Sequence, residues 1–81
     1  MAKLTIKELV GARVRDIRKE RGLTQQKLAD RTHLSLNMIG YVERGIKFPS
    51  ADTFEKLSKA LAVTPDRLFK SDPKDAKRGK K

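Results

Sequence analysis

The chain has 81 residues, a length that fits one compact domain and excludes a second domain with its own core. It contains no cysteine and a single histidine, His33, which excludes disulfides, thiolate metal sites and a paired-histidine ligand set. Its 20 lysines and arginines against 10 acidic residues give a formal net charge of +10 and a pI near 10.3, which favours a polyanionic partner such as nucleic acid.

Charged residues interrupt the sequence every few positions and leave no apolar stretch long enough for a signal peptide or a membrane span. A domain of this size buries only about 60 to 65% of the surface that its unfolded chain exposes, so there is little room for a deep catalytic cavity. The sequence contains no nucleophile with a base, no carboxylate pair, no Gly-rich phosphate loop and no metal cluster. We therefore expect a soluble cytoplasmic protein that is not an enzyme and has no cofactor, metal, small-molecule ligand or membrane partner.

The first predicted element is an amphipathic helix over residues 6–21. Its apolar residues recur at spacings of three and four, at Ile6, Leu9, Val10, Val14 and Ile17. Thr5 and Glu8, three residues apart, match a capping box at the start of the helix, and Gly22 suits a left-handed cap at its end. The sequence therefore predicts both the start and the end of this helix.

Two shorter helices are predicted next, over residues 25–31 and 36–44. Thr24 and Ser35 are good N-cap residues for them, and Gly45 ends the second. Because only a few residues join the two helices, they cannot lie side by side and must cross at a steep angle. This arrangement is typical of a helix-turn-helix.

The junction of these two helices has the residues that a close crossing needs. Ala29 is small enough for the contact, His33 tolerates the positive φ of the turn, and Leu34 buries the corner. Ile39 and Val42, one helical turn apart, then face the core. The outer face of the second short helix carries Leu36, Asn37, Gly40, Tyr41 and Arg44.

The C-terminal part of the chain predicts two more helices and a tail. Pro49 breaks the chain before a helix over residues 51–61, whose apolar stripe is Phe54, Leu57 and Leu61. Pro65 suits the first position of a last short helix that directs Leu68 and Phe69 inward. Residues 70–81 have six basic and two acidic side chains and no large apolar one, which predicts a disordered basic tail.

Together these elements predict an all-α fold of five helices without a strand, in one domain over residues 1–69. The segment LTQQKLADRTHLSLNMIGYVERG resembles the helix-turn-helix of the Cro and phage-repressor family, also called the XRE family. IRKERGLTQ upstream and FPSADTFEKLSKALAVTPDRLF downstream are similar to the family's first, fourth and fifth helices, so the resemblance covers residues 6–69. The landmarks at the family's spacing are Gln25, Ala29, Leu34, Ile39, Val42, Glu43, Gly45 and Pro49. The resemblance implies a compact lambda-repressor-like domain.

The family places its third helix in the DNA major groove. The resemblance therefore implies that Leu36, Asn37, Gly40 and Tyr41 face base edges, joined by Arg44. The chemistry of these side chains suits the role, because asparagine can pair with adenine N6 and N7 and leucine can pack on a thymine methyl group. Arg44 can reach a guanine or a phosphate.

The resemblance also implies phosphate contacts and one structural ion pair. The family sets the N-terminus of its second helix on a phosphate, which makes Gln25 the expected anchor, with Ser35, Arg44 and Lys47 as further backbone contacts. Arg18 and Glu43 match a buried ion pair between the family's first and third helices. The alternative is that both are solvated surface charges, the ordinary state of arginine and glutamate.

Three positions depart from the family pattern. The usual glycine of the turn is His33, and the residue before it, often apolar, is Thr32. We interpret His33 as a structural or solvated residue in preference to a pH switch or ligand. Gly40 offers no side chain at the centre of the reading face, although glycine inside a helix costs about 1 kcal/mol relative to alanine. Close approach of the backbone to DNA would explain it.

Some alternatives stay open on sequence alone. Leu36 fits either DNA contact or isolated surface exposure, since single exposed apolar residues are common. Tyr41 fits either the exposed face or the core. The basic tail fits either DNA binding or solubility.

The function that we expect is a sequence-specific DNA-binding regulator, most simply a repressor, of bacterial or phage type and associated with the nucleoid. Family members of this size mostly act as homodimers on palindromic double-stranded DNA sites. Candidate dimer residues are Leu4, Ile6, Leu68 and Phe69. One alternative is an antitoxin-type protein-interaction module with secondary DNA binding, which the charged tail argues against. A third possibility is a sequence-independent binder that relies on charge, and the ratio of cognate to random DNA affinity distinguishes it.

Overall fold

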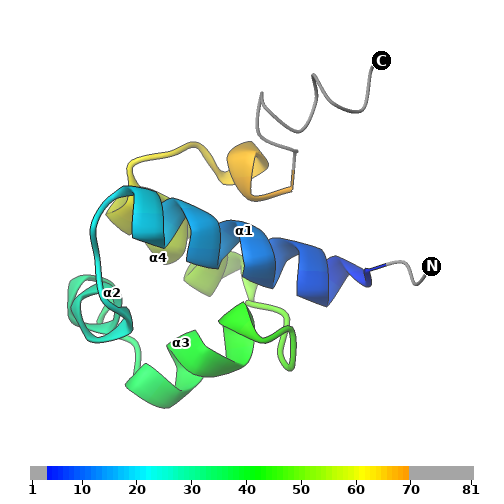
Figure 1. The fold of residues 1–81 in the computed structure, drawn as a ribbon, viewed down its shortest axis with the longest axis horizontal. Helices are drawn as coiled ribbons and strands as arrows, with labels where there is room; N and C mark the ends of the chain where they lie inside the picture. Colours follow the sequence, from blue (N-terminus) through cyan, green and yellow to red (C-terminus); the bar gives the residue numbers. More distant parts are fainter. Residues whose placement is uncertain (1–3, 70–81) are drawn as a thin grey trace.

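The computed structural model describes residues 4–69, which form four α-helices and one 3₁₀ helix (Figure 1). In chain order these are α1 (Ile6–Glu20), α2 (Gln25–Thr32), α3 (Leu36–Glu43), α4 (Ala51–Leu61) and η1 (Pro65–Leu68). The all-helical class is confirmed, and this part of the chain contains no strand. Each of its helices is too short or too polar to cross a membrane. The predicted basic tail, residues 70–81, lies outside the described residues.

The fifth predicted helix does begin at Pro65, but it is a single 3₁₀ turn and not a full helix like the other four. The amide of Arg67 donates to the carbonyl of Thr64, and that of Phe69 to Asp66, which are the three-residue steps of a 3₁₀ helix. Phe69 is also not directed inward as predicted, since 44% of its surface is exposed, whereas Leu68 is fully buried. The Phe69 ring instead stacks on Phe54 at the edge of the core, with centroids 4.9 Å apart.

The predicted helix starts are confirmed by their caps. The Thr5 hydroxyl accepts from the Glu8 amide at 3.2 Å, and the Glu8 carboxylate accepts from the Thr5 amide at 3.0 Å, which completes the capping box. Gly22 follows α1 with a φ of 72°, as a left-handed cap requires. The same N-cap hydrogen bond is made by Thr24, Ser35 and Ser50. Three predicted helix ends, at residues 21, 31 and 44, differ from the structure by one residue.

The core lies where all the helices meet. In Figure 1, α1 passes in front of α4, and α2 and α3 lie below both. The fully buried side chains include Val10, Val14, Ile17, Leu28, Ile39, Val42, Leu57 and Leu61. Gly11 allows α1 to approach the end of α3, because a Cβ at this position would lie 2.2 Å from the Val42 carbonyl oxygen. The helix-turn-helix is thus held against α1 by direct backbone contact.

Ala62, which ends α4, is expected to be improved by glycine. Its φ of 60° lies in the left-handed region, which costs an L-residue about 1 to 2 kcal/mol and glycine almost nothing. Ala62→Gly should therefore stabilise the fold, as measured by urea unfolding. The gain should not exceed about 1 kcal/mol, because glycine also has more conformational freedom than alanine in the unfolded chain and this offsets part of the relieved strain. Ala60→Gly, inside α4, is the control and should destabilise by about 1 kcal/mol. Equal effects at the two positions would contradict the assignment of strain to Ala62.

Candidate nucleic-acid interface

The turn between α2 and α3 accommodates both unusual residues. His33 has a φ of 61° and a ψ of 25°, and its amide donates to the carbonyl of Ala29. Thr32 is only 2% exposed, and its hydroxyl donates to the Leu28 carbonyl at 2.8 Å. The same hydroxyl accepts from the Leu34 amide at 3.3 Å. Thr32 is therefore a satisfied core residue, and His33 takes the left-handed position predicted for it.

The turn presents one side of α3 to the core and the other to the outside. Ala29 is buried at the crossing of the helices, as are Ile39 and Val42 on α3. The five predicted base-reading positions lie one helical turn apart or adjacent, so they share the opposite face: Leu36, Asn37, Gly40, Tyr41 and Arg44. Asn37 and Arg44 are exposed, and Leu36 keeps 44% of its surface exposed.

Tyr41 is half-buried, so it belongs neither fully to the exposed face of α3 nor fully to the core. The guanidinium carbon of Arg44 lies 5.7 Å from the centre of its ring, within the range of a cation–π contact. This contact orients Arg44, which caps α3, along the outer face of the helix.

Gly40 has no structural reason to be glycine. A Cβ added here would meet only the end of the Arg44 side chain, at 3.8 Å, an ordinary van der Waals distance. By contrast, a Cβ on Gly45 would lie 2.8 Å from the side chain of Glu8, at a φ of 75° that itself favours glycine. The fold thus requires glycine at 45 but leaves open space at 40, in the middle of the exposed face of α3.

A buried ion pair ties the helix-turn-helix to α1. The Arg18 Nε lies 2.6 Å from the Glu43 Oε2, and the Arg18 Nη2 donates to Oε1 at 3.1 Å. The side chains are only 10% and 2% exposed. Arg18 also donates to the Leu23 carbonyl at 2.8 Å. The alternative of two solvated surface charges is therefore wrong.

Gln25 also joins this pair, a contact that no local sequence pattern predicts. Its Nε2 donates to the Glu43 Oε1 at 3.0 Å, so the Gln25 side chain at the start of α2 is fixed by the buried carboxylate of α3. Of the other residues predicted to contact phosphates, Ser35 is exposed and caps α3, its hydroxyl accepting from the Met38 amide at 3.0 Å. Lys47 is exposed in the loop after α3. Ser35 and Lys47 thus lie at opposite ends of α3, before its first residue and in the loop after its last.

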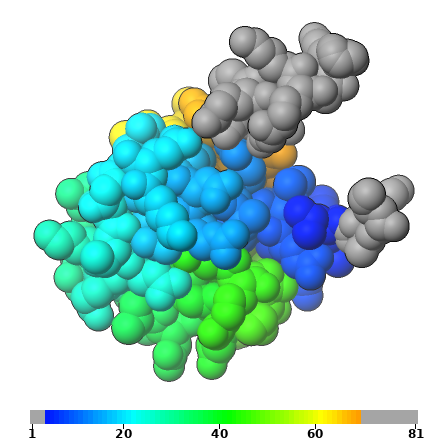
Figure 2. Space-filling model, in the orientation of Figure 1, coloured from blue at the N-terminus to red at the C-terminus, as the bar shows by residue number. Residues whose placement is uncertain are grey.

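Exposed apolar side chains mark a second surface. Apart from Leu36, the large ones belong to the start of α1, the loop after α3 and the end of η1, at Leu4, Ile6, Leu9, Ile46, Phe48 and Phe69. We call this set the apolar patch. The rings of Phe48 and Phe69 are 6.3 Å apart, and Figure 2 shows the start of α1, in dark blue, beside the green surface that follows α3. Ile46 and Phe48 were not predicted, although two apolar residues in a basic loop are a signal of exposure.

Comparison with known proteins gives the family. Residues 14–68 match the helix-turn-helix model HTH_3. The control protein C.BamHI of Bacillus amyloliquefaciens is 42% identical over 65 residues, 79% of this chain and 80% of its own. The controller protein C.AhdI of Aeromonas hydrophila is similar in structure, with 36% identity and a TM-score of 0.76 over 78% of this chain and 96% of its own. The P22 c2 repressor in complex with a synthetic operator has 36% identity and a TM-score of 0.74 over 79% and 97%. The chain belongs to the HTH_3 helix-turn-helix family of transcription regulators, which includes repressors and restriction-modification controller proteins.

Proposed function

We propose that the protein is a sequence-specific DNA-binding regulator that inserts α3 into the major groove. The observation that carries this proposal is the outer face of α3, where exposed Asn37 and Arg44 flank a glycine that the fold does not need. A major groove about 12 Å wide admits a helix, and these side chains can read base edges. The net charge of +10 supports a polyanionic partner. The similar P22 c2 repressor was solved in complex with a synthetic operator, which supports operator DNA as the partner of this chain.

The regulator is further proposed to be a repressor that works as a homodimer on a palindromic site, in the cytoplasm of a bacterium. The apolar patch supports self-association, because exposed clusters of apolar side chains mark interaction surfaces. Repressors and controller proteins among its relatives support the mode of regulation. Two half-sites give a short recognition helix the specificity that one half-site lacks.

Asn37→Ala tests whether this residue reads bases. We expect a loss of about 1 to 3 kcal/mol on the cognate site, a relaxed preference at one base pair of each half-site, and an unchanged salt dependence. Lys47→Ala, the control for a phosphate contact, should weaken cognate and random DNA alike and flatten the log–log salt slope by about 0.9. Binding isotherms across a salt series measure both. An Asn37→Ala protein that still discriminates every operator position would remove Asn37 from the reading face.

The dimer is expected to protect two half-sites related by an inverted repeat, with centres about 34 to 36 Å apart. Phe48→Gln should convert it to a monomer, because it places an amide in the apolar patch. Leu36→Gln is the matched control and should leave the dimer intact. Leu36 and Phe48 are equally exposed, at 44%, but Leu36 lies on the proposed DNA face and outside the apolar patch. Sedimentation and footprinting measure assembly and half-site spacing. A wild-type monomer on a single half-site would contradict the dimer and favour another protein as the occupant of the patch, as the antitoxin-type alternative requires.

A further inference from the structure

The buried Glu43 carboxylate, at the end of α3, connects three helices. Its Oε2 lies 2.6 Å from the Arg18 Nε of α1, and its Oε1 accepts from the Arg18 Nη2 at 3.1 Å. The same Oε1 accepts from the Gln25 Nε2 of α2 at 3.0 Å. The Glu43 side chain is buried, whereas Gln25 is only partly buried. The network therefore runs from the core to the surface at the start of α2.

The hydrogen bond to Glu43 fixes the Gln25 amide group without using all of its donors. A glutamine amide has two N–H donors and one carbonyl acceptor. One donor bonds the Glu43 carboxylate, and Gln25 makes no other side-chain hydrogen bond within residues 4–69. A free glutamine side chain loses rotamer freedom when it binds a partner, but this one is already held by the fold. Its second donor is therefore preorganised for an acceptor outside the network.

The start of α2 offers a further donor at the same residue. The Thr24 hydroxyl caps α2 by accepting from the Lys27 amide at 3.0 Å. The Gln25 amide is the first of the helix, and the first amides of a helix have no carbonyl partner within it. The positive end of the helix dipole lies at the same place. A phosphate oxygen is the acceptor that suits these donors.

Arg18 makes the buried carboxylate compatible with a phosphate nearby. An unpaired carboxylate beneath the start of α2 would repel an anion, and away from water this repulsion would be weakly screened. The Arg18 guanidinium bonds both oxygens of Glu43 and so neutralises its charge. Glu43 can then accept from Gln25 without opposing the approach of a phosphate.

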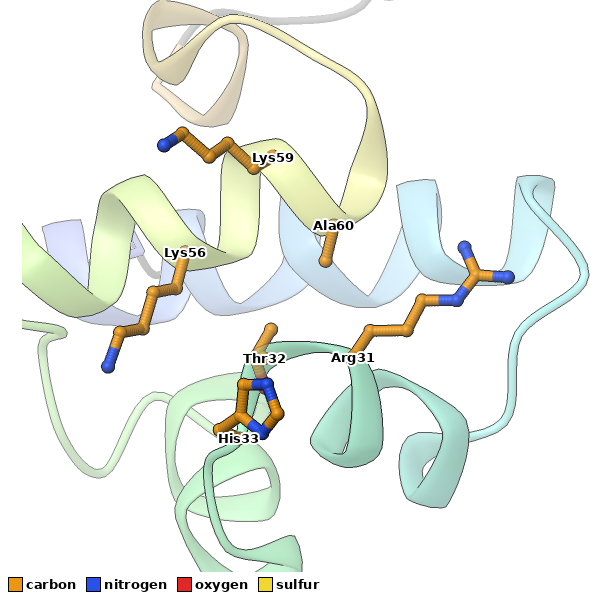
Figure 3. Close-up of a pocket in the computed structure, with 6 residues that line it drawn as sticks. All are labelled: Arg31, Thr32, His33, Lys56, Lys59 and Ala60. Carbon is orange, nitrogen blue, oxygen red and sulfur yellow. The ribbon is translucent and has the colours of Figure 1, made fainter.

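The other end of α2 gathers no comparable set of donors. Arg31, in the last turn of α2, lines an open pocket together with Lys56 and Lys59 of α4. Figure 3 shows the charged ends of these three side chains directed apart. The negative end of the helix dipole also lies there and disfavours an anion. The start of α2 is therefore the end that suits a phosphate.

We propose that Glu43 is a positioning residue for DNA binding, which holds Gln25 so that the second N–H of its amide donates to a DNA phosphate. Arg18 contributes by neutralising Glu43. The ion pair thus serves the affinity for DNA in addition to the stability of the fold. This inference rests on the proposed function, and it adds a route by which α1 and α3 act on the phosphate contact of α2.

Gln25→Met tests the contact, because methionine has a similar length and no N–H donor. We expect cognate and random DNA to bind about tenfold more weakly, as the loss of one hydrogen bond to a charged group predicts. The log–log salt slope should not change, because glutamine carries no charge. Gln26→Met is the matched control and should leave both affinities unchanged, since the exposed Gln26 side chain bonds Asp30 of its own helix at 3.0 Å. Binding isotherms across a salt series measure these effects.

A double-mutant cycle tests whether Glu43 acts through Gln25. Arg18→Met with Glu43→Leu removes the acceptor and leaves no buried charge, so the protein should stay folded. It should bind DNA up to about tenfold more weakly, and the triple variant with Gln25→Met should bind no more weakly than Gln25→Met alone. Arg18→Met with Glu43→Gln keeps an acceptor oxygen for Gln25 and should restore most of the affinity. Circular dichroism at the temperature of the isotherms checks that each variant is folded.

Several outcomes would overturn the inference. Unchanged DNA affinity of Gln25→Met would exclude the phosphate contact, and a relaxed preference at one base pair would make Gln25 a base-reading residue instead. An unchanged affinity of the variant without the ion pair, or additive losses in the cycle, would mean that Glu43 does not act through Gln25. Failure of the proposed function is a different result, because the wild-type protein itself would then fail to discriminate cognate from random DNA.

Discussion

Replacing Glu43 by alanine is expected to destabilise the fold by about 3 to 5 kcal/mol. The Arg18 guanidinium would keep only its hydrogen bond to the Leu23 carbonyl and would remain buried without a counter-charge. Gln25 would lose its acceptor as well. Urea unfolding monitored by circular dichroism measures the loss, and the melting temperature should fall by about 4 to 8 °C for each kcal/mol in a domain of this size.

Two further variants separate the stranded charge from other causes. Asp52→Ala breaks the exposed pair with Lys56 and should change stability by no more than about 0.5 kcal/mol. The double variant Arg18→Met with Glu43→Leu removes both charges and fills the space, so it should be more stable than Glu43→Ala. A loss below about 1 kcal/mol for Glu43→Ala would mean that solvent reaches the pair and screens it.

The parts of the fold that could be predicted are those set by residues close together in the sequence. An N-cap hydroxyl bonds an amide three residues on, so Thr24, Ser35 and Ser50 mark their helices without any knowledge of the tertiary fold. The left-handed turn at His33 was predictable for the same reason. The 3₁₀ geometry of the last helix could not be predicted, because proline marks where a helix begins but does not decide between α and 3₁₀ geometry over four residues.

The features that could not be predicted join segments that are distant in sequence. From the sequence alone, Gly11 is only a residue that disfavours a helix. The structure gives the reason for it, because a Cβ at this position would lie 2.2 Å from the Val42 carbonyl oxygen of α3. The hydrogen bond from Gln25 to Glu43 depends in the same way on how α2 meets α3. The pairing of Arg18 with Glu43 was accessible only through resemblance, because its 25-residue separation fits no local pattern. The DNA contacts themselves stay predictions, since they depend on a partner.

Gly40 gives the second large expected effect, with opposite signs in the free and bound protein. Gly40→Ala should stabilise the fold by about 1 kcal/mol, because alanine is the better helix former and its Cβ has space on α3. If Gly40 is glycine because the backbone approaches the base edges, the same methyl group should weaken cognate DNA binding. Gly40→Leu, a longer side chain at that position, should lower the cognate affinity to the level of random DNA, a loss of at least about 10³-fold.

The measurement pairs thermal unfolding with isotherms on cognate and random DNA. Ala62→Gly is the control, because it should stabilise the fold by a similar amount at the end of α4 and leave both DNA affinities unchanged. Added stability alone would then be excluded as the cause of lost binding. Random DNA should bind the Gly40 variants nearly as well as wild type, because non-specific binding depends on phosphate contacts that these variants retain. A Gly40→Leu protein that keeps its cognate affinity would place the centre of α3 away from the base edges, and Gly40 would then have no function that its surroundings explain.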